Sequence, residues 1–201
     1  MKAKNLNDLI EKLRGETKIL VTGPCRSGTT ICCHILEREL GLTFIDSHSN
    51  YEDSAKSIGY VPTFGTFLNF SKHCHNFIAH GPHFHPFLHQ VPKDVMIVFM
   101  RRPIEDVMAS TKRIFKGKWN SKWYDKRSRL GVPFGLKGYF DKLNYAQKTY
   151  WVWDNFQKMN INKYIEVSYN ILKQHELFIP KRQRKKFRER QWQAQTALVK
   201  C

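Results

Sequence analysis

Acidic residues are scarce in this chain, and their scarcity leaves it strongly basic. Its 201 residues include 17 Asp and Glu against 34 Lys and Arg, which gives a formal net charge of +17 at pH 7. Such a charge predicts attraction to polyanions and faster capture of anionic ligands. It does not by itself choose between nucleic acid, an acidic glycan and a highly phosphorylated cofactor.

Long hydrophobic runs are also missing. The longest apolar stretch, Val95 to Met100, is far shorter than the roughly 20 residues of a membrane-spanning helix. The first residues, Met1 to Asn5, have no apolar core of the kind that a secretory signal contains. Because 41% of the residues are hydrophobic and 13% are aromatic, the composition predicts a folded globule. We therefore expect a soluble, cytoplasmic protein.

Cysteines are few and lack paired spacing. An odd count of five argues against a disulfide framework. Cys32 and Cys33 fall on an expected helix, where free cysteine packs as a small apolar residue. No internal repeat is present, so the length predicts a single domain over residues 1–201. A basic, helical tail is expected at about 180–201.

A glycine-bracketed segment near the N-terminus carries the strongest signal. Residues 17–22 are typical of a short apolar strand, a loop follows, and a helix begins near Thr29. Glycines let the backbone curl so that successive N–H groups face an anion, and the helix dipole adds its positive end. This layout predicts a phosphate-binding loop. The residues assigned to it are Gly23, Cys25, Arg26, Ser27, Gly28, Thr29 and Thr30.

The loop lacks one residue that nucleotide triphosphatases need. Their loop has the pattern G-x-x-x-x-G-K-S/T, in which the lysine reaches the β- and γ-phosphates. Thr29 stands at the lysine position here, and the nearest cation is Arg26, inside the loop. The substitution favours a site for a phosphate or phosphosulfate over ordinary γ-phosphoryl transfer.

Strands and helices alternate along the chain. This pattern predicts an α/β, single-domain P-loop fold with a mostly parallel central sheet flanked by helices. Ligands of such sheets bind at the carboxyl ends of the strands, where the first loop lies. Strands are expected at 17–22, 43–45, 77–79, 94–100 and 164–167, and helices at 6–14, 29–40, 63–74, 103–115 and 136–158, with a long loop at 116–135.

Two arginines follow the buried strand at 94–100. Arg101 and Arg102 come at its carboxyl end, and Pro103 then opens a helix, a position where proline is favoured. An arginine at such a strand end can grip a phosphate with its guanidinium fork. Ser110, two turns into the helix, can add a hydroxyl to the same oxygen cluster.

With both segments in view, the chain resembles the sulfotransferases that use 3′-phosphoadenosine-5′-phosphosulfate (PAPS). Their 5′-phosphosulfate loop is close to P-K/R-S-G-T-T, which residues 26–30 match from the second position onward. Their 3′-phosphate site is an arginine at a strand end with a serine eight residues later. Arg102 and Ser110 have that spacing, and Arg101 is the competing arginine because it fits Arg-x-Pro. The stretch 166–172 resembles a late strand that ends in Tyr-Glu-Asp/Asn-Leu, which implies that Tyr169 approaches the adenine.

The resemblance implies sulfuryl transfer from PAPS to an acceptor hydroxyl or amine, with adenosine 3′,5′-bisphosphate as the product and no metal. Arg26 would stabilise the charge that builds as the sulfuryl bond breaks. Several members carry the catalytic base in a His-x-Pro at a strand end, and His80 matches that position. His83 and His85 are fallback candidates for the base, and an acidic residue is a further alternative. The implied acceptor is a small molecule or a glycan, acidic ones included.

Histidines crowd residues 73–89 without familiar zinc-finger spacing. We therefore expect a lining of the acceptor cleft or a histidine-rich surface, and no metal site. Two other functions stay open. One is a P-loop kinase for nucleotides or small molecules, which Thr29 speaks against. The other is a basic nucleic-acid-binding module, since residues 112–129 mix basic and aromatic side chains.

Overall fold

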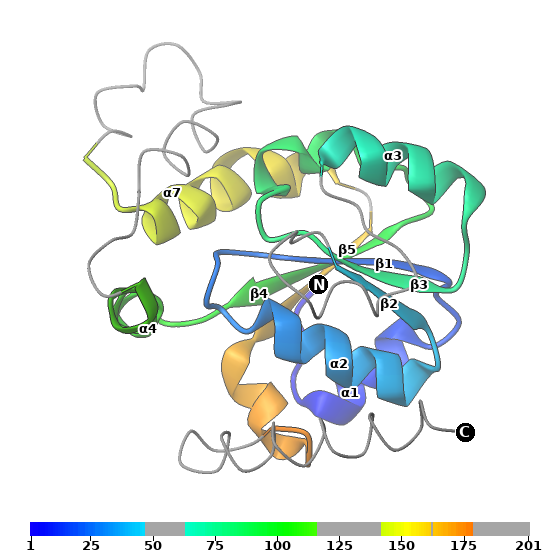
Figure 1. Cartoon of the computed structure of the whole chain (residues 1–201), viewed down its shortest axis with the longest axis horizontal. Coiled ribbons are helices and arrows are strands. Elements are labelled where there is room, and N and C mark those ends of the chain that lie inside the picture. Colours follow the sequence, from blue (N-terminus) through cyan, green and yellow to red (C-terminus); the bar gives the residue numbers. More distant parts are fainter. Residues whose placement is uncertain (47–62, 116–141, 162, 179–201) are drawn as a thin grey trace, which may run out of the picture.

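A five-stranded parallel sheet forms the centre of the chain (Figure 1). The computed structural model describes residues 1–46, 63–115, 142–161 and 163–178. The strand order is β2-β3-β1-β4-β5. The expected α/β fold with a mostly parallel central sheet flanked by helices is confirmed. The strands are β1 (Lys18–Thr22), β2 (Thr43–Asp46), β3 (Phe77–His80), β4 (Met96–Arg101) and β5 (Tyr164–Ser168).

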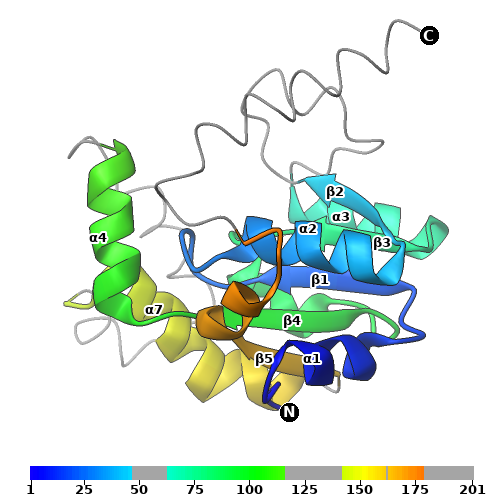
Figure 2. The same ribbon diagram turned by 90° about the horizontal axis from the view of Figure 1, so that it is seen from below.

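Helices cover both faces of the sheet. The described helices are α1 (Leu6–Leu13), α2 (Thr29–Leu40), α3 (Phe64–His73), η2 (His85–Gln90), α4 (Ile104–Phe115), α7 (Tyr145–Val152), η4 (Trp153–Gln157), η5 (Lys158–Asn160) and η6 (Tyr169–Gln174). One face carries α1, α2 and η6, and the other carries α3, η2 and α7 (Figure 1). Helix α4 stands beyond the carboxyl end of β4 (Figure 2). The strands and the first four helices that the sequence predicts are present within a few residues of their expected ends.

The last expected helix differs from the prediction. Lys142 to Asn144 form a turn, and α7 begins only at Tyr145. Asn144 and Gln147 bond each other's backbone N–H groups with their side chains. This capping box fixes the helix start, so a helix over 136–158 is wrong within the described residues. Beyond Val152 the chain continues as a π-turn and a 3₁₀ turn. The expected loop at 116–135 and the tail at 180–201 lie outside the described residues.

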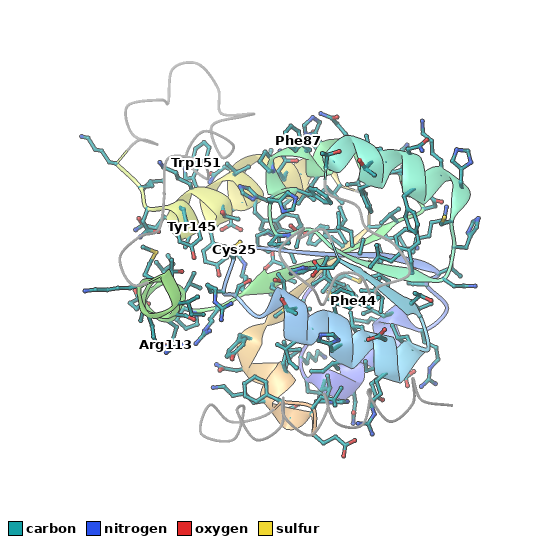
Figure 3. The ribbon with its side chains drawn as sticks, viewed as in Figure 1. Cys25, Phe44, Phe87, Arg113, Tyr145 and Trp151 are labelled. Atoms are coloured by element: carbon teal, nitrogen blue, oxygen red, sulfur yellow. The ribbon has the colours of Figure 1, made fainter. Side chains whose placement is uncertain are left out.

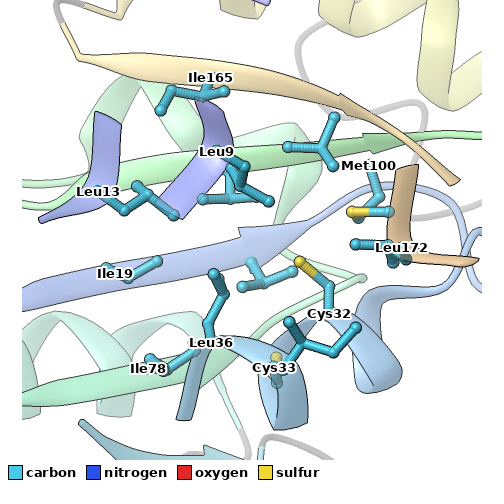
Figure 4. Packing of buried hydrophobic residues seen from close by; sticks show 14 of the residues in the cluster. Leu9, Leu13, Ile19, Cys32, Cys33, Leu36, Ile78, Met100, Ile165 and Leu172 are labelled. Carbon is cyan, nitrogen blue, oxygen red and sulfur yellow. The ribbon is translucent and has the colours of Figure 1, made fainter. Parts of the chain in front are cut away.

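Alternate side chains of each strand supply two separate cores. Ile19 and Val98 face the cluster under α1 and α2, which Figure 4 shows. Leu20 and Phe99 face the aromatic cluster under α3, η2 and η4. This pattern follows from the two-residue repeat of a strand that is buried on both faces. In the described residues, no helix is both long and apolar enough to cross a lipid bilayer.

The adjacent cysteines at positions 32 and 33 lie in the core, as predicted. Cys32 and Cys33 are fully buried in the α1–α2 cluster (Figure 4). Burial raises the pKa of the Cys32 thiol to about 12. The thiol is therefore protonated at neutral pH, which suits an apolar packing role.

The strand order decides what surrounds the loop that follows β1. Strand β1 is central, between β3 and β4. The hydroxyl of Thr22 donates to the carbonyl of Gly81 at 2.8 Å, which ties the end of β1 to the chain just beyond β3. His80 therefore reaches the loop from one side, and Arg102, which follows β4, reaches it from the other.

Candidate functional site

Two glycines let the loop after β1 lie against its neighbours. Gly23 has a φ of +135°, and a Cβ there would lie 2.7 Å from the carbonyl oxygen of Met100. Gly28 has a φ of +100°, and a Cβ there would lie 2.5 Å from the ring of Tyr169. The loop is thus held between β4 and η6. Its two glycines have a backbone conformation that residues with a Cβ rarely adopt. Arg26 is one of the few non-glycine residues with positive φ, at 73°.

The loop ends in a helix start that is open to an anion. Gly28 is the N-cap of α2 and supplies no side-chain cap, whereas Asn5, Thr63 and Asn144 cap other helices with their side chains. The hydroxyl of Ser27 is buried and has no hydrogen-bond partner among the described residues. A buried, unpaired hydroxyl costs about 1–3 kcal/mol. A phosphate seated in the loop would relieve that cost and meet the positive end of the helix dipole.

Arg102 lies at the loop. Its Nη1 donates to the backbone carbonyl of Arg26 at 3.1 Å, and its guanidinium lies 4.2 Å above the ring of Tyr169. Its Nε lies 3.6 Å from the carboxylate of Asp106. The hydroxyl of Tyr150 accepts from the Arg102 N–H at 2.9 Å and donates to the Arg102 carbonyl at 2.8 Å. Backbone and side chain are therefore both fixed, with the guanidinium beside the loop.

Two more guanidinium groups lie near the hydroxyl of Ser110. Arg26 Nε lies 3.4 Å from its hydroxyl, and Arg113 Nη2 also lies 3.4 Å from it. Ser110 is buried. Arg113 extends from α4, as Figure 3 shows, and the sequence reasoning did not place it in the site. The available signal is its position three residues after Ser110, which puts both on one face of a helix.

Arg101 takes a different direction. Its Nε donates to Glu166 at 3.1 Å, and it forms an ion pair with Asp154. Burial raises the pKa of the Glu166 carboxyl, but the hydrogen bond from Trp153 and the charges of Arg101 and Lys158 outweigh this effect and leave that pKa below its usual value. The structure therefore brings Arg102 to the loop, whereas Arg101 pairs with the buried Glu166 and with Asp154.

His80 lies on the opposite side of the loop and joins it to β2. Its Nε2 lies 2.9 Å from the hydroxyl of Thr29 and 3.5 Å from that of Thr30. Its Nδ1 lies 2.8 Å from the carboxylate of Asp46. The His80 residue is only 4% exposed. Asp46 was not among the residues expected at the site, because its proximity depends on β2 pairing with β3.

The fallback histidines are buried just beyond β3, His83 in a turn and His85 at the start of η2. His83 packs edge-on against the ring of Phe84. His85 Nδ1 donates to the carbonyl of Pro82 at 3.2 Å, and burial lowers the pKa of His85 to about 4. Among the described residues, no group of three or more His, Cys, Asp and Glu side chains is placed to hold a metal ion.

The remaining loop and strand-end residues pack around the same centre. Tyr169 is buried between Gly28 and Arg102. Its contact with an adenine stays a prediction. The carbonyl of Cys25 accepts from the hydroxyl of Tyr145 at 2.9 Å. Figure 3 shows Cys25 and Tyr145 close together where α7 meets the loop. Tyr145 was not predicted, because only the fold brings α7 to this point.

A separate cleft lies at the opposite end of the strands from the phosphate loop. Its lining includes Val95 and Lys163, which precede β4 and β5. These positions are at the amino ends of the strands. The cleft is therefore remote from the phosphate loop and takes no part in the site described above.

Comparison with known proteins identifies no relative from which a function follows. No family model and no curated protein matches this chain. Among solved structures, shikimate kinase from Acinetobacter baumannii in complex with shikimate aligns at 18% identity with a TM-score of 0.40, covering 78% of this chain and 86% of that chain. A likeness at this level assigns neither a family nor an activity.

Proposed function

We propose that this chain transfers a sulfuryl group from PAPS to an acceptor hydroxyl or amine. One observation carries the proposal. A phosphate loop with Thr29 in place of the nucleotidase lysine adjoins a cluster of guanidinium groups. Those of Arg26 and Arg113 approach the Ser110 hydroxyl, and that of Arg102 contacts the loop backbone. Such a loop beside such a cluster suits a donor with phosphate groups at two positions, and PAPS carries a 5′-phosphosulfate and a 3′-phosphate.

The two groups of residues divide the donor between them. The loop amides with the hydroxyls of Ser27, Thr29 and Thr30 would hold the 5′-phosphate. Arg102, Ser110 and Arg113 would hold the 3′-phosphate, with guanidinium forks that suit phosphate oxygens. The Arg26 side chain begins in the loop and ends at Ser110, so it contributes positive charge between the two phosphates.

The transfer itself needs an in-line arrangement and charge stabilisation. The acceptor oxygen or nitrogen bonds to sulfur as the bond from sulfur to the 5′-phosphate oxygen breaks. Adenosine 3′,5′-bisphosphate leaves with the electron pair, and the loop neutralises its growing charge. The acceptor's proton passes to Nε2 of His80, which faces the loop hydroxyls. The free cysteines suit a reducing compartment, so we place the reaction in the cytoplasm.

The direct test is selective stabilisation by the reaction product. Adenosine 3′,5′-bisphosphate at about 100 times its dissociation constant should stabilise the fold by about 2.7 kcal/mol. ATP with Mg²⁺ and adenosine 5′-phosphate should do much less at the same concentration. Thermal unfolding with each ligand measures the difference. An equal response to all three, or none, contradicts the proposal. Salt-dependent stabilisation by nucleic acid alone would instead favour a nucleic-acid-binding module.

A kinase is the second candidate, and one observation favours it. Thr30 occupies the Ser/Thr position of the loop. Its hydroxyl and the Asp46 carboxylate lie at the two ring nitrogens of His80. Nucleotide kinases hold Mg²⁺ with a loop hydroxyl and a nearby Asp. This candidate predicts that ATP stabilises the fold only with Mg²⁺ and that a chelator removes the effect, so the same measurement separates the two functions.

A further inference from the structure

Three side chains form a hydrogen-bonded row at the edge of the phosphate loop. Asp46 ends β2, His80 ends β3, and Thr29 begins α2. Asp46 and His80 are direct partners in the parallel register of β2 and β3. Sheet pairing therefore fixes their separation, and the 2.8 Å contact between Asp46 Oδ1 and His80 Nδ1 does not depend on a loop.

The row determines where the imidazole carries its proton. An ionised carboxylate only accepts hydrogen bonds, so Nδ1 of His80 must be the protonated nitrogen. In a neutral ring Nε2 is then an acceptor, and the hydroxyl of Thr29 donates to it at 2.9 Å. A carboxylate behind a histidine fixes both its tautomer and its orientation.

Packing restricts the ring further. The His80 side chain is 6% exposed, against 27% for that of Asp46. Phe44 lies edge-on to the His80 ring, with 6.3 Å between the centroids. The next peptide is fixed as well, because Gly81 accepts from the Thr22 hydroxyl. With the ring held, its bare nitrogen points at the helix start of α2.

We infer that Asp46 is a positioning residue for His80 in the sulfuryl transfer proposed above, an inference that rests on that function. The acceptor replaces Thr29 as the hydrogen-bond donor to Nε2. As the acceptor bonds to sulfur, its proton moves to Nε2, and the Nδ1 proton stays on the ring. Asp46 remains ionised and stabilises the imidazolium that forms.

The first experiment separates positioning from binding. Asp46→Asn keeps the size of the side chain and removes its charge. The assay is release of radiolabelled sulfate from PAPS, with water as the acceptor. The variant should bind adenosine 3′,5′-bisphosphate with unchanged affinity and keep its KM for PAPS, while kcat falls by about 100-fold or more. Asp46→Glu should restore part of kcat, because it returns a carboxylate.

Glu37→Gln provides the matched control. Glu37 also pairs with a histidine ring, His34, but on the exposed side of α2. Its other oxygen accepts from the N–H of Phe44, a contact that Gln can keep. This variant should retain kcat, so a loss confined to Asp46→Asn is not a general effect of removing an acid–histidine pair.

The second experiment reads the tautomer without any turnover. Nitrogen-15 spectra of the His80 ring should show a protonated Nδ1 and a bare Nε2 in the wild type. Asp46→Asn should move the ring toward the other tautomer. Unchanged kcat with an unchanged tautomer overturns the inference alone. A wild-type chain that releases no sulfate and binds no bisphosphate overturns the proposed function. The contact between Asp46 and His80 would then serve only to join β2 and β3.

Discussion

Arg101 and Arg102 are neighbours in the sequence but act on opposite faces of the sheet. The alternation of side chains along β4 continues through the strand end. Arg101 therefore lies over the rings of Phe99 and Tyr150, and Arg102 lies over Tyr169 beside the loop. At this scale a shift of one residue decides whether a guanidinium neutralises a buried carboxylate or lies beside the loop.

This placement leads to a prediction for Arg102→Ala. A hydrogen bond to a charged group contributes about 1.5–3 kcal/mol, and each 1.4 kcal/mol is a tenfold change in affinity. The variant should therefore bind adenosine 3′,5′-bisphosphate about 10- to 100-fold more weakly. Its affinity for adenosine 5′-phosphate should change far less, because that ligand lacks the 3′-phosphate. Titration calorimetry with both nucleotides measures the two losses.

Lys112→Ala is the control, since it removes an exposed cation from α4. Both affinities should stay close to wild type. Arg102→Lys keeps the charge but loses the guanidinium fork, so it should fall between wild type and Arg102→Ala. Equal losses for the two nucleotides would remove Arg102 from the 3′-phosphate role.

Sequence reasoning reached the residues that belong to local patterns. Gly23 and Gly28 are visible because a loop that curls around an anion needs them at that spacing. Asp46 and Tyr145 could not be predicted in this way. Their proximity to the site follows from strand order and helix docking, and no local pattern in the chain encodes either. Arg113 has a local signal, because it follows Ser110 by three residues on the same helix.

At the scale of elements, the start of α2 differs from the starts of α1, α3 and α7. Its N-cap is Gly28, which provides no side-chain hydrogen bond. Helices α1, α3 and α7 each begin with such a bond. The same local chemistry explains the error in the expected helix over 136–158. Apolar spacing predicts a helical face, but the capping box at Asn144 decides where the helix starts.

The start of α2 leads to a prediction for Ser27→Ala. The Ser27 hydroxyl is buried without a partner among the described residues, so its removal should leave the unfolding free energy of the ligand-free protein unchanged or raise it by about 1 kcal/mol. The same change should weaken binding of adenosine 3′,5′-bisphosphate, because the hydroxyl would donate to the 5′-phosphate. Urea unfolding without ligand and calorimetric titration measure the two effects.

Ser71→Ala is the matched control for this pair of effects. Ser71 is equally buried, but its hydroxyl donates to the carbonyl of Leu68 at 2.9 Å. Its loss should destabilise the ligand-free fold by about 1 kcal/mol and leave ligand binding unaffected. If Ser27→Ala destabilises the ligand-free protein as much as Ser71→Ala does, the Ser27 hydroxyl is already satisfied within the protein.

At the scale of the whole molecule, ionisable groups whose pKa shifts on folding make stability depend on pH. The Glu166 carboxyl has a pKa below its usual value, and so does that of Asp94, which Lys18 contacts at 2.8 Å. Both carboxyls lose protons more readily in the folded state than in the unfolded state. Their contribution to stability is therefore present near neutral pH and is lost only as the pH falls through their lowered values, in the acid range.

His85 acts at higher pH than these carboxyls. Burial lowers its pKa from 6.5 to about 4, so below pH 6.5 the unfolded chain binds a proton that the folded chain excludes. Stability should fall by about 2 kcal/mol between pH 7 and pH 5 from this group alone. His85→Gln removes the titrating ring, and its unfolding free energy in urea should decline much less over that interval. His73→Gln, which changes an exposed histidine at the end of α3, should keep the wild-type decline. A decline as steep in His85→Gln as in the wild type would show that another group takes up the proton.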